Sequence, residues 1–485
     1  MSTTAKQFVF DWISQNEKKI VEMNDAIWRF AELGLQEFKT GKLCADTLER
    51  NGFKVEREVA GMPSAFVAAY GQGKPVIGIM GELDALPSLS QKALPYKAPF
   101  EEGAPGHGCG HNAYATSAVA AGIGVKVALD EGHIEGTVKV FGCPAEETLV
   151  GKVFMVRDGC FNGLDACLGN HTGSVNGVDL SGGTAMNSFK VEFYGRASHA
   201  GASPERGRSA LDAAELMNIG VNYLREHIVQ EARIHYVVEN GGVQPNVVPP
   251  YARSWYYVRA PLRETVEQIY QRVLKIAGAA DEMAETTHKI TFLTGCYQKL
   301  NNIALSDLAV RNMREIGAPT YTHEEYAFAK ELGKSIPREE KISGLRTSGL
   351  PNWEELVDID ICDRIYDPWG DPKSSKGGST DVSDVMWNTP TIQIRTAGFI
   401  VGAPGHSWQN AATMGMSIGH KSVIFGAKTM AGTVLDLLTN PNMLRGVREE
   451  FQASTKGFTY RSPLPADLKP PLTQLERRPE KETKE

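Results

Sequence analysis

The 485-residue chain has no long hydrophobic run and no excess of positive charge. Its longest weakly polar stretch, around residues 115–129, is interrupted by glycine and lysine and is shorter than the roughly 20 apolar residues that a membrane-spanning helix needs. A formal net charge of −7 without a basic stripe removes the electrostatic reason to expect nucleic acid. We therefore expect a small-molecule partner, and neither a membrane nor a nucleic acid.

The chain also lacks the segments of a secretory signal and the cysteine pattern of a disulfide framework. Its seven cysteines are odd in number and scattered, which is typical of reduced thiols. Both features favour the cytoplasm. What is present is an ordinary globular composition, with 42% hydrophobic and 22% charged residues, at a length that favours about two or three domains.

Residues 1–187 and 299–461 alternate between helical and strand-like segments, which predicts a layered α/β domain. The signals are apolar residues at helical spacing and short apolar runs bounded by glycine or proline. Helices are predicted over residues 5–31, 39–51, 114–129, 152–158 and 421–438, and strands over 66–70, 76–80, 137–141, 166–168 and 392–394.

Residues 188–298 follow a different order, β-α-β-β-α-β, which matches the ferredoxin-like unit. We therefore expect a compact α+β domain inserted into the larger domain. Residues 320–378 are rich in proline, glycine and charge and are expected to form an irregular insertion. Residues 462–485 are expected to be a disordered tail.

The loop GHGCGHN at 106–112 places Cys109 and His111 two residues apart, directly before a predicted helix. Glycines let the backbone fold closely enough for both side chains to face one ion, and a thiolate with an imidazole suits zinc or a similar metal. Taken alone, this loop is equally compatible with a flexible segment that carries an incidental cysteine and histidine.

Two adjacent acids, Glu146 and Glu147, follow the predicted strand 137–141. Ligands bind at the carboxyl edge of open α/β sheets, so one acid could ligate a metal while the other holds the proton of an attacking water. The alternative is an exposed acidic pair at a helix N-terminus.

His171 and His406 also lie on loops that follow strand-like runs. Either histidine alone is more often structural. Together with Cys109, His111 and Glu147 they make five candidate ligands, more than the three or four of one zinc ion, and this favours a site for two metals.

The GHGCGHN loop, PAEE at 144–147, ASHAG at 197–201, PNVVP at 245–249 and GAPGHS at 402–407 together resemble the M20 peptidase family in its amidohydrolase branch. The order of motifs and the inserted domain agree over nearly the whole chain. The resemblance implies a lid or dimerisation role for that domain and two divalent ions per chain, zinc or manganese. It implies the metal ligands Cys109, His111, Glu147, His171 and His406, with Cys109 as a candidate bridge.

The resemblance also implies that Glu146 is the general base and acid. His199 of the inserted domain matches a histidine that approaches the active site of a partner subunit and stabilises the oxyanion, which requires at least a dimer. Asn246 and Arg259 match positions near the carboxylate of the substrate. A homodimer is expected, with a heteromer of related subunits as the alternative.

The chain departs from the family pattern in its first motif, where other members carry a ligand histidine and this chain has GELDALP at 81–87. His111 is expected to take over that ligand role, and Asp84 is expected to orient an imidazole. The branch often has Ser-Glu-Asp-Phe where this chain has Ser379-Thr-Asp-Val, which leaves the substrate open.

The expected reaction is hydrolysis of the amide bond of an N-acyl or N-aroyl amino acid, with p-aminobenzoyl-glutamate as the leading individual substrate. The ions would polarise the carbonyl, and Glu146 would accept the proton of water and return it to the leaving amine. Two alternatives stay open at this point. The same site could release ammonia from an aromatic amine, or the chain could be a regulatory subunit paired with a related catalytic chain.

Overall fold

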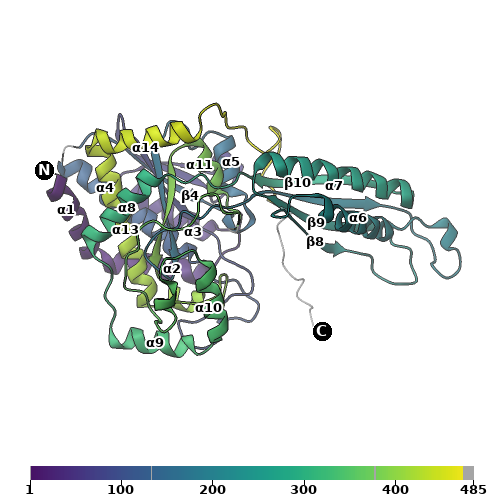
Figure 1. The fold of residues 1–485 in the computed structure, drawn as a ribbon, viewed down its shortest axis with the longest axis horizontal. Helices are drawn as coiled ribbons and strands as arrows, with labels where there is room; N and C mark the ends of the chain where they lie inside the picture. The colour runs from purple at the N-terminus through teal and green to yellow at the C-terminus, as the bar shows by residue number, and fades with distance from the viewer. Residues whose placement is uncertain (1, 133, 376–377, 473–485) are drawn as a thin grey trace.

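The computed structural model describes residues 2–132, 134–375 and 378–472. A layered main domain and an elongated inserted domain that projects from it make up the molecule (Figure 1). Within the described residues, no helix combines the length and apolar character needed to cross a membrane.

The main domain is built on a seven-stranded sheet with the order β1-β2-β4-β3-β5-β11-β6. Strands β3, β4, β5 and β11 are parallel to one another, whereas β1, β2 and β6 pair with antiparallel neighbours. The carboxyl ends of the four parallel strands therefore meet at one edge of the sheet. The strands are β1 (Lys54–Arg57), β2 (Phe66–Gln72), β3 (Val76–Glu82), β4 (Gly136–Cys143), β5 (Ala166–Gly173), β6 (Gly177–Val178) and β11 (Thr391–Ala397).

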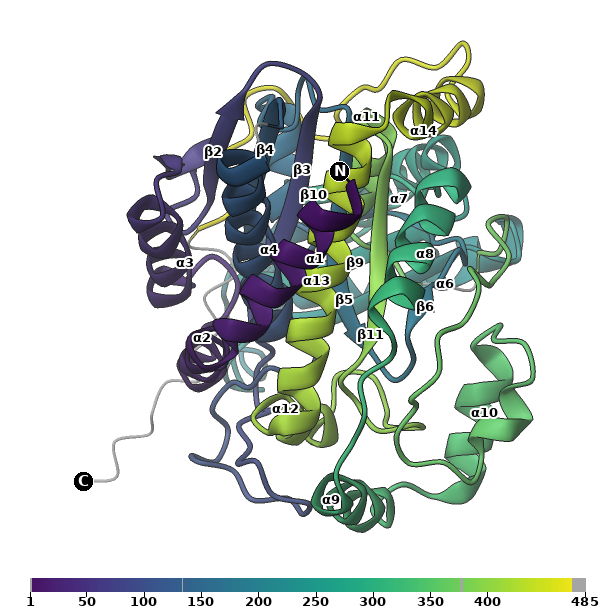
Figure 2. The same ribbon diagram turned by 90° about the vertical axis from the view of Figure 1, so that its left-hand side faces the viewer.

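Helices cover both faces of this sheet, which explains why β3 is a continuous apolar run. Ile77 and Ile79 point into one core cluster and Met80 into the other. The first face carries α1 (Ser2–Gln15), α2 (Glu17–Phe30), α3 (Phe38–Arg50), α4 (His111–Gly132), α8 (Ile303–Ile316) and α13 (Ser417–Thr439), several of which lie in front of the sheet in Figure 2. The second carries α5 (Gly151–Arg157) and α11 (Val382–Asn388). Helices α12 (Trp408–Met414) and α14 (Pro441–Ser454) complete the domain.

The first turn of α4 lies very close to the end of β3. A Cβ atom at Gly81 would stand only 3.1 Å from the Cα atom of Ala115, so only glycine permits this approach without a shift. The close packing brings His111, the first residue of α4, next to Glu82 and Asp84 at the end of β3.

The inserted domain has the expected ferredoxin-like fold. Its antiparallel sheet has the order β10-β7-β9-β8, with α6 and α7 packed against it. The elements are β7 (Ala185–Tyr194), α6 (Ala210–Leu224), β8 (Arg233–Asn240), β9 (Tyr251–Ala260), α7 (Arg263–Ala284) and β10 (Thr287–Cys296). The domain has its own core, in which the rings of Phe189 and Tyr256 stack with centroids 5.5 Å apart. The α/β fold class with an inserted α+β domain is thereby confirmed.

The expectation of an irregular segment over 320–378 was wrong for its first half, which forms α9 (His323–Gly333) and α10 (Arg338–Thr347). Helix α9 begins with a capping box, in which Thr322 and Glu325 each bind the other's backbone N–H group. Its Ala329 and Leu332 are buried against Ile418. The helix is too short for the apolar spacing to stand out from the surrounding charge. Similarly, the single helix expected over 5–31 is divided into α1 and α2 at Asn16.

The first part of the expected disordered tail is packed on the main domain. Leu464 is buried, and Arg157 donates a hydrogen bond of 2.5 Å to the carbonyl oxygen of Leu468. Backbone hydrogen bonds to distant side chains hold this segment, and sequence composition does not reveal them. Residues 473–485 of the expected tail lie outside the described residues.

Candidate active site

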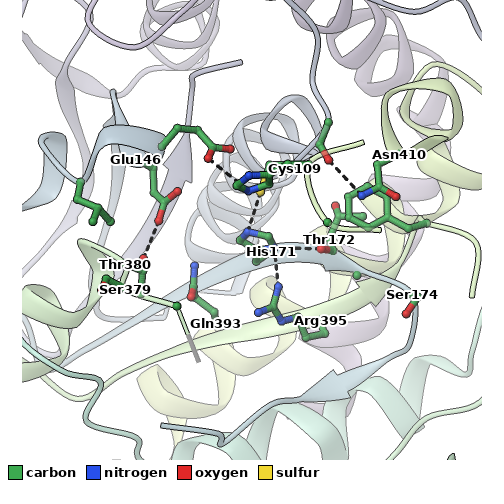
Figure 3. A pocket seen from close by; sticks show the side chains of 18 of the residues that line it. Cys109, Glu146, His171, Thr172, Ser174, Ser379, Thr380, Gln393, Arg395 and Asn410 are labelled. Atoms are coloured by element: carbon green, nitrogen blue, oxygen red, sulfur yellow. Dashed lines mark hydrogen bonds and ion pairs between the residues drawn. The ribbon is translucent and has the colours of Figure 1, made fainter. Parts of the chain in front are cut away.

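A cleft of about 530 Å³ lies at the carboxyl edge of the parallel strands and is lined by residues of both domains, including Arg259 of the inserted domain. Cys109, Glu146, Glu147, His171 and His406 all line this cleft. They come from the start of α4, the turn after β4, the end of β5 and the loop after β11. Parallel strand order thus brings together loops that are far apart in the sequence (Figure 3).

The five predicted ligands divide between two groups that both contain Cys109. The first group is Cys109, His111 and His171, and the second is Cys109, Glu147 and His406. In each group the ligand atoms lie within 4.8 Å of one another. The Sγ atom of Cys109 is 3.4 Å from Nε2 of His171, and Nε2 of His406 is 3.4 Å from Oε2 of Glu147. Cys109 would therefore be able to contribute its thiolate to either group.

The donor set fits a pair of divalent transition metals. Oε1 of Glu147 is buried and has no hydrogen-bond partner among the described residues, which is costly unless a cation binds there. Nε2 of His111 is also buried, and it lies 3.1 Å from Oε2 of Glu82. Burial raises the pKa of the Cys109 thiol to about 12 and that of Glu147 to about 8. A bound cation would offset this penalty and favour the ionised, ligating forms.

Asp84 connects the two ligand groups. Its Oδ1 atom lies 3.0 Å from Nδ1 of His111, which leaves Nε2 of that ring directed toward the site. Its Oδ2 atom accepts a 2.9 Å hydrogen bond from the backbone N–H of Glu147. The structure thus places Asp84 where the predicted orienting role requires it.

Glu146 lines the cleft beside His111 of the first ligand group. The hydroxyl of Thr380 donates a hydrogen bond of 2.7 Å to its Oε1 atom, as Figure 3 shows. Its Oε2 atom is 3.9 Å from Nε2 of His111. One carboxylate oxygen is therefore fixed, and the other faces the predicted metal ligands, which is the geometry of a general base for water.

A buried ion cluster behind the site was not predicted from the sequence. The Lys152 ammonium lies 2.9 Å from Oε1 of Glu82 and 2.7 Å from Oδ1 of Asp381, and all three side chains are fully buried. The other oxygen of Glu82 is 3.1 Å from Nε2 of His111. Glu82, His111 and Glu146 form a third group with ligand-like spacing. The Lys152 ammonium holds Glu82 and compensates one of the two carboxylate charges that it joins, so we assign Glu82 to support of the site.

The structure separates the predicted substrate-contacting residues. Arg259, near the end of β9, lines the cleft and donates a 3.2 Å hydrogen bond to Ser379. His199 and Asn246 follow the opposite end of the sheet, on adjoining loops joined by a 2.9 Å backbone hydrogen bond from Ala200 to Asn246. Neither residue lines the cleft of its own chain. Their predicted contact with substrate therefore stays a prediction that requires a partner subunit.

The chain belongs to the M20 peptidase family of metal-dependent hydrolases. Residues 185–284 match the model of the peptidase dimerisation domain. The chain is 38% identical over 473 residues to one of the subunits of p-aminobenzoyl-glutamate hydrolase of Escherichia coli K12, and the match covers 96% of this chain and 98% of that protein. It is 28% identical over 460 residues to a Xaa-Arg dipeptidase of Mus musculus, covering 91% and 90% of the two chains.

A solved structure supports the same fold. The YxeP protein of Bacillus subtilis, described as a dinuclear metal binding peptidase of the M20 family, superposes with a TM-score of 0.53 at 16% identity and covers 88% of this chain and 99% of its own. At this identity the likeness concerns the fold.

We predict that Lys152→Met lowers the free energy of unfolding by about 3–5 kcal/mol, because it leaves the buried carboxylates of Glu82 and Asp381 without a cation. Urea denaturation of the metal-free protein measures the change. The control is Lys42→Met, which breaks an exposed pair with Asp46 and should cost less than about 1 kcal/mol. Equal effects of the two substitutions would contradict the importance of the cluster.

Glu37 holds the turn that precedes Glu146 and Glu147. Its carboxylate accepts hydrogen bonds of 2.8 Å from the backbone N–H of Ala145 and from the hydroxyl of Ser64. Burial, and secondarily the charge of Asp84, raises the pKa of Glu37 to about 8. Because the unfolded value is near 4.5, the stability that protonated Glu37 contributes is complete below about pH 4.5 and is lost as the pH rises through 8.

We therefore predict that Glu37→Gln flattens the pH dependence of unfolding in the metal-free protein. The amide keeps the shape and neutrality of the protonated acid, so the variant should gain stability relative to wild type as pH rises from 5 to 8. The gain is at most about 1.4 kcal/mol per pH unit. Urea titrations at four pH values measure it, and parallel curves for the two proteins would show that Glu37 ionises normally.

Proposed function

We propose that this chain is a dinuclear amidohydrolase that converts an N-acyl or N-aroyl amino acid to a carboxylic acid and a free amino acid. The observation that carries the proposal is the pair of ligand groups that share Cys109 beside Glu146. The name of the related p-aminobenzoyl-glutamate hydrolase favours an aroyl-glutamate as substrate. Zinc and manganese both suit the mixed thiolate, imidazole and carboxylate donors.

When bound, the two ions would polarise the amide carbonyl and lower the pKa of water in the cleft. Glu146 accepts the proton of the attacking water at Oε2, because Thr380 binds Oε1. Glu146 then returns that proton to the nitrogen of the leaving amino acid. Arg259, which lines the cleft, would bind the carboxylate of that amino acid through its guanidinium group.

His199 and Asn246 would complete the site from a partner subunit in the cytoplasmic enzyme. Their distance from the cleft of their own chain and the match to a dimerisation domain support a homodimer. Because two relatives are named as different subunits of one hydrolase, the alternative is a regulatory or catalytic role in a complex of related chains. Activity of the purified single chain would exclude a purely regulatory role. Release of free amino acid rather than ammonia would exclude the deaminase alternative.

Glu146→Gln should retain the metals and reduce kcat by a factor of about 1,000 or more, because the amide cannot accept the proton of water. Hydrolysis of N-benzoyl and p-aminobenzoyl amino acids, measured beside elemental metal analysis, checks both parts. Glu56→Gln on the exposed strand β1 is the control and should leave kcat unchanged. A Glu146→Gln enzyme of normal activity would refute the assignment of the base.

The shared thiolate predicts unequal effects on metal content. Cys109→Ala should lose most of both ions, whereas His406→Ala should retain about one ion per chain, because only the second ligand group loses a donor. Elemental analysis after dialysis against a fixed metal concentration distinguishes the two variants. If Cys109→Ala still binds as much metal as His406→Ala, the thiolate is not a bridge.

A further inference from the structure

The cleft carries more positive charge than the proposed reaction uses. Arg259, Lys299 and Arg395 all line the cleft. Within the part of the chain that the structure describes, none of these three cations forms an ion pair with a carboxylate. Partly desolvated cations without counter-charges are unfavourable unless an anionic ligand compensates them.

Lys299 and Arg395 lie near each other. Arg259 is held separately, by a contact with another part of the chain. Arg259 is bound to Ser379 and lies over the ring of Tyr257 in the inserted domain. Lys299 follows β10, and the methylene groups of its side chain pack against Gly183. Burial, followed by the charge of Arg395, lowers the pKa of Lys299. The two side chains also border a second small cavity, beside Asp179.

The guanidinium group of Arg395 can donate hydrogen bonds to a ligand in the cleft. It extends from β11 toward His171, with Nη1 2.6 Å from Nδ1 of the ring (Figure 3). Nδ1 of His171 also lies 3.0 Å from the carbonyl oxygen of Thr172. If His171 ligates metal through Nε2, Nδ1 carries the proton and donates it to this carbonyl, so it cannot accept from Arg395. The guanidinium N–H groups of Arg395 therefore suit an external acceptor.

The acidic groups in and around the cleft have other partners. Glu146 accepts from Thr380, and Glu147 faces His406. Asp179 accepts from the backbone N–H of Ser181 and is not within ion-pair distance of Lys299. A compensating anion for Lys299 and Arg395 must then come with the ligand.

We propose that Lys299 and Arg395 form a second anion subsite that binds a side-chain carboxylate of the substrate. The inference rests on the proposed amidohydrolase function, in which Arg259 already binds the main carboxylate. The substrate class is thereby narrowed to amides of dicarboxylic amino acids. A substrate with a cationic side chain, such as the arginine that a Xaa-Arg dipeptidase is named for, meets repulsion from this pair.

Binding to the metal-loaded Glu146→Gln protein, which cannot turn the ligand over, tests the subsite directly. Isothermal titration calorimetry would compare N-benzoyl-glutamate with N-benzoyl-glutamine and N-benzoyl-arginine near neutral pH. We expect N-benzoyl-glutamate to bind at least about 10-fold more tightly than N-benzoyl-glutamine, and N-benzoyl-arginine to bind weakest. Equal affinities for the three ligands would overturn the proposal.

Adding Lys299→Met or Arg395→Gln to the same protein should remove most of the preference for glutamate over glutamine. The affinity for N-benzoyl-glutamine should change less than about threefold. The control is Lys92→Met, which removes an exposed lysine outside the cleft. Metal content is measured in each protein, because Arg395 contacts a predicted ligand. An unchanged ratio in both subsite variants would overturn the proposal.

The same experiments separate this inference from the proposed function. If wild-type enzyme hydrolyses none of the three amides while the binding preference is present, the subsite is supported and the amidohydrolase proposal fails. If wild-type enzyme hydrolyses all three with similar kcat/KM and the binding preference is absent, the amidohydrolase proposal is supported and the subsite fails.

Discussion

The two hydrogen-bonded oxygens of Asp84 constrain the geometry of the whole site. One oxygen fixes the imidazole at the start of α4, and the other fixes the backbone at the turn after β4. These two elements carry ligands of different predicted ions. Because Asp84 closely follows β3, the central strand of the sheet sets the separation of the two groups. The close approach of β3 and α4 at Gly81 also maintains this geometry, since any side chain there would displace α4 and His111.

The sequence was sufficient to predict that the candidate ligands lie close together, because each follows a strand-like run or directly precedes a helix. Parallel strands place such positions at one edge, so Cys109, Glu147 and His171 had to meet if the fold was correct. Lys152 was not predicted, because a lone lysine in a short helix has no pattern that shows its burial. The alternation of Ile392 and Ile394 with Gln393 and Arg395 indicates a strand, but it does not show which side of the sheet faces the cleft. No pattern around Lys299 shows where its side chain points. Only the packed structure shows that these three cations face the site or its support.

The two domains contribute different parts of the predicted site. The predicted metal ligands, the base and the buried ion cluster all belong to the main domain. The inserted domain supplies Arg259 at its junction with the main domain, and His199 and Asn246 at its far end. The predicted chemistry and its support are thus held by one sheet, whereas the contacts of Arg259, His199 and Asn246 depend on how the inserted domain is placed.

The elongated shape of the inserted domain has a mechanical consequence. Strand β7 has ten residues, and at ~3.3 Å per residue it extends ~33 Å from the junction. A rotation of ~10° about the junction would move the far end by ~6 Å but would scarcely move Arg259. The domain would therefore act as a lever, because a small rotation that leaves Arg259 in place would change the position of His199 and of the proposed contact with a partner subunit.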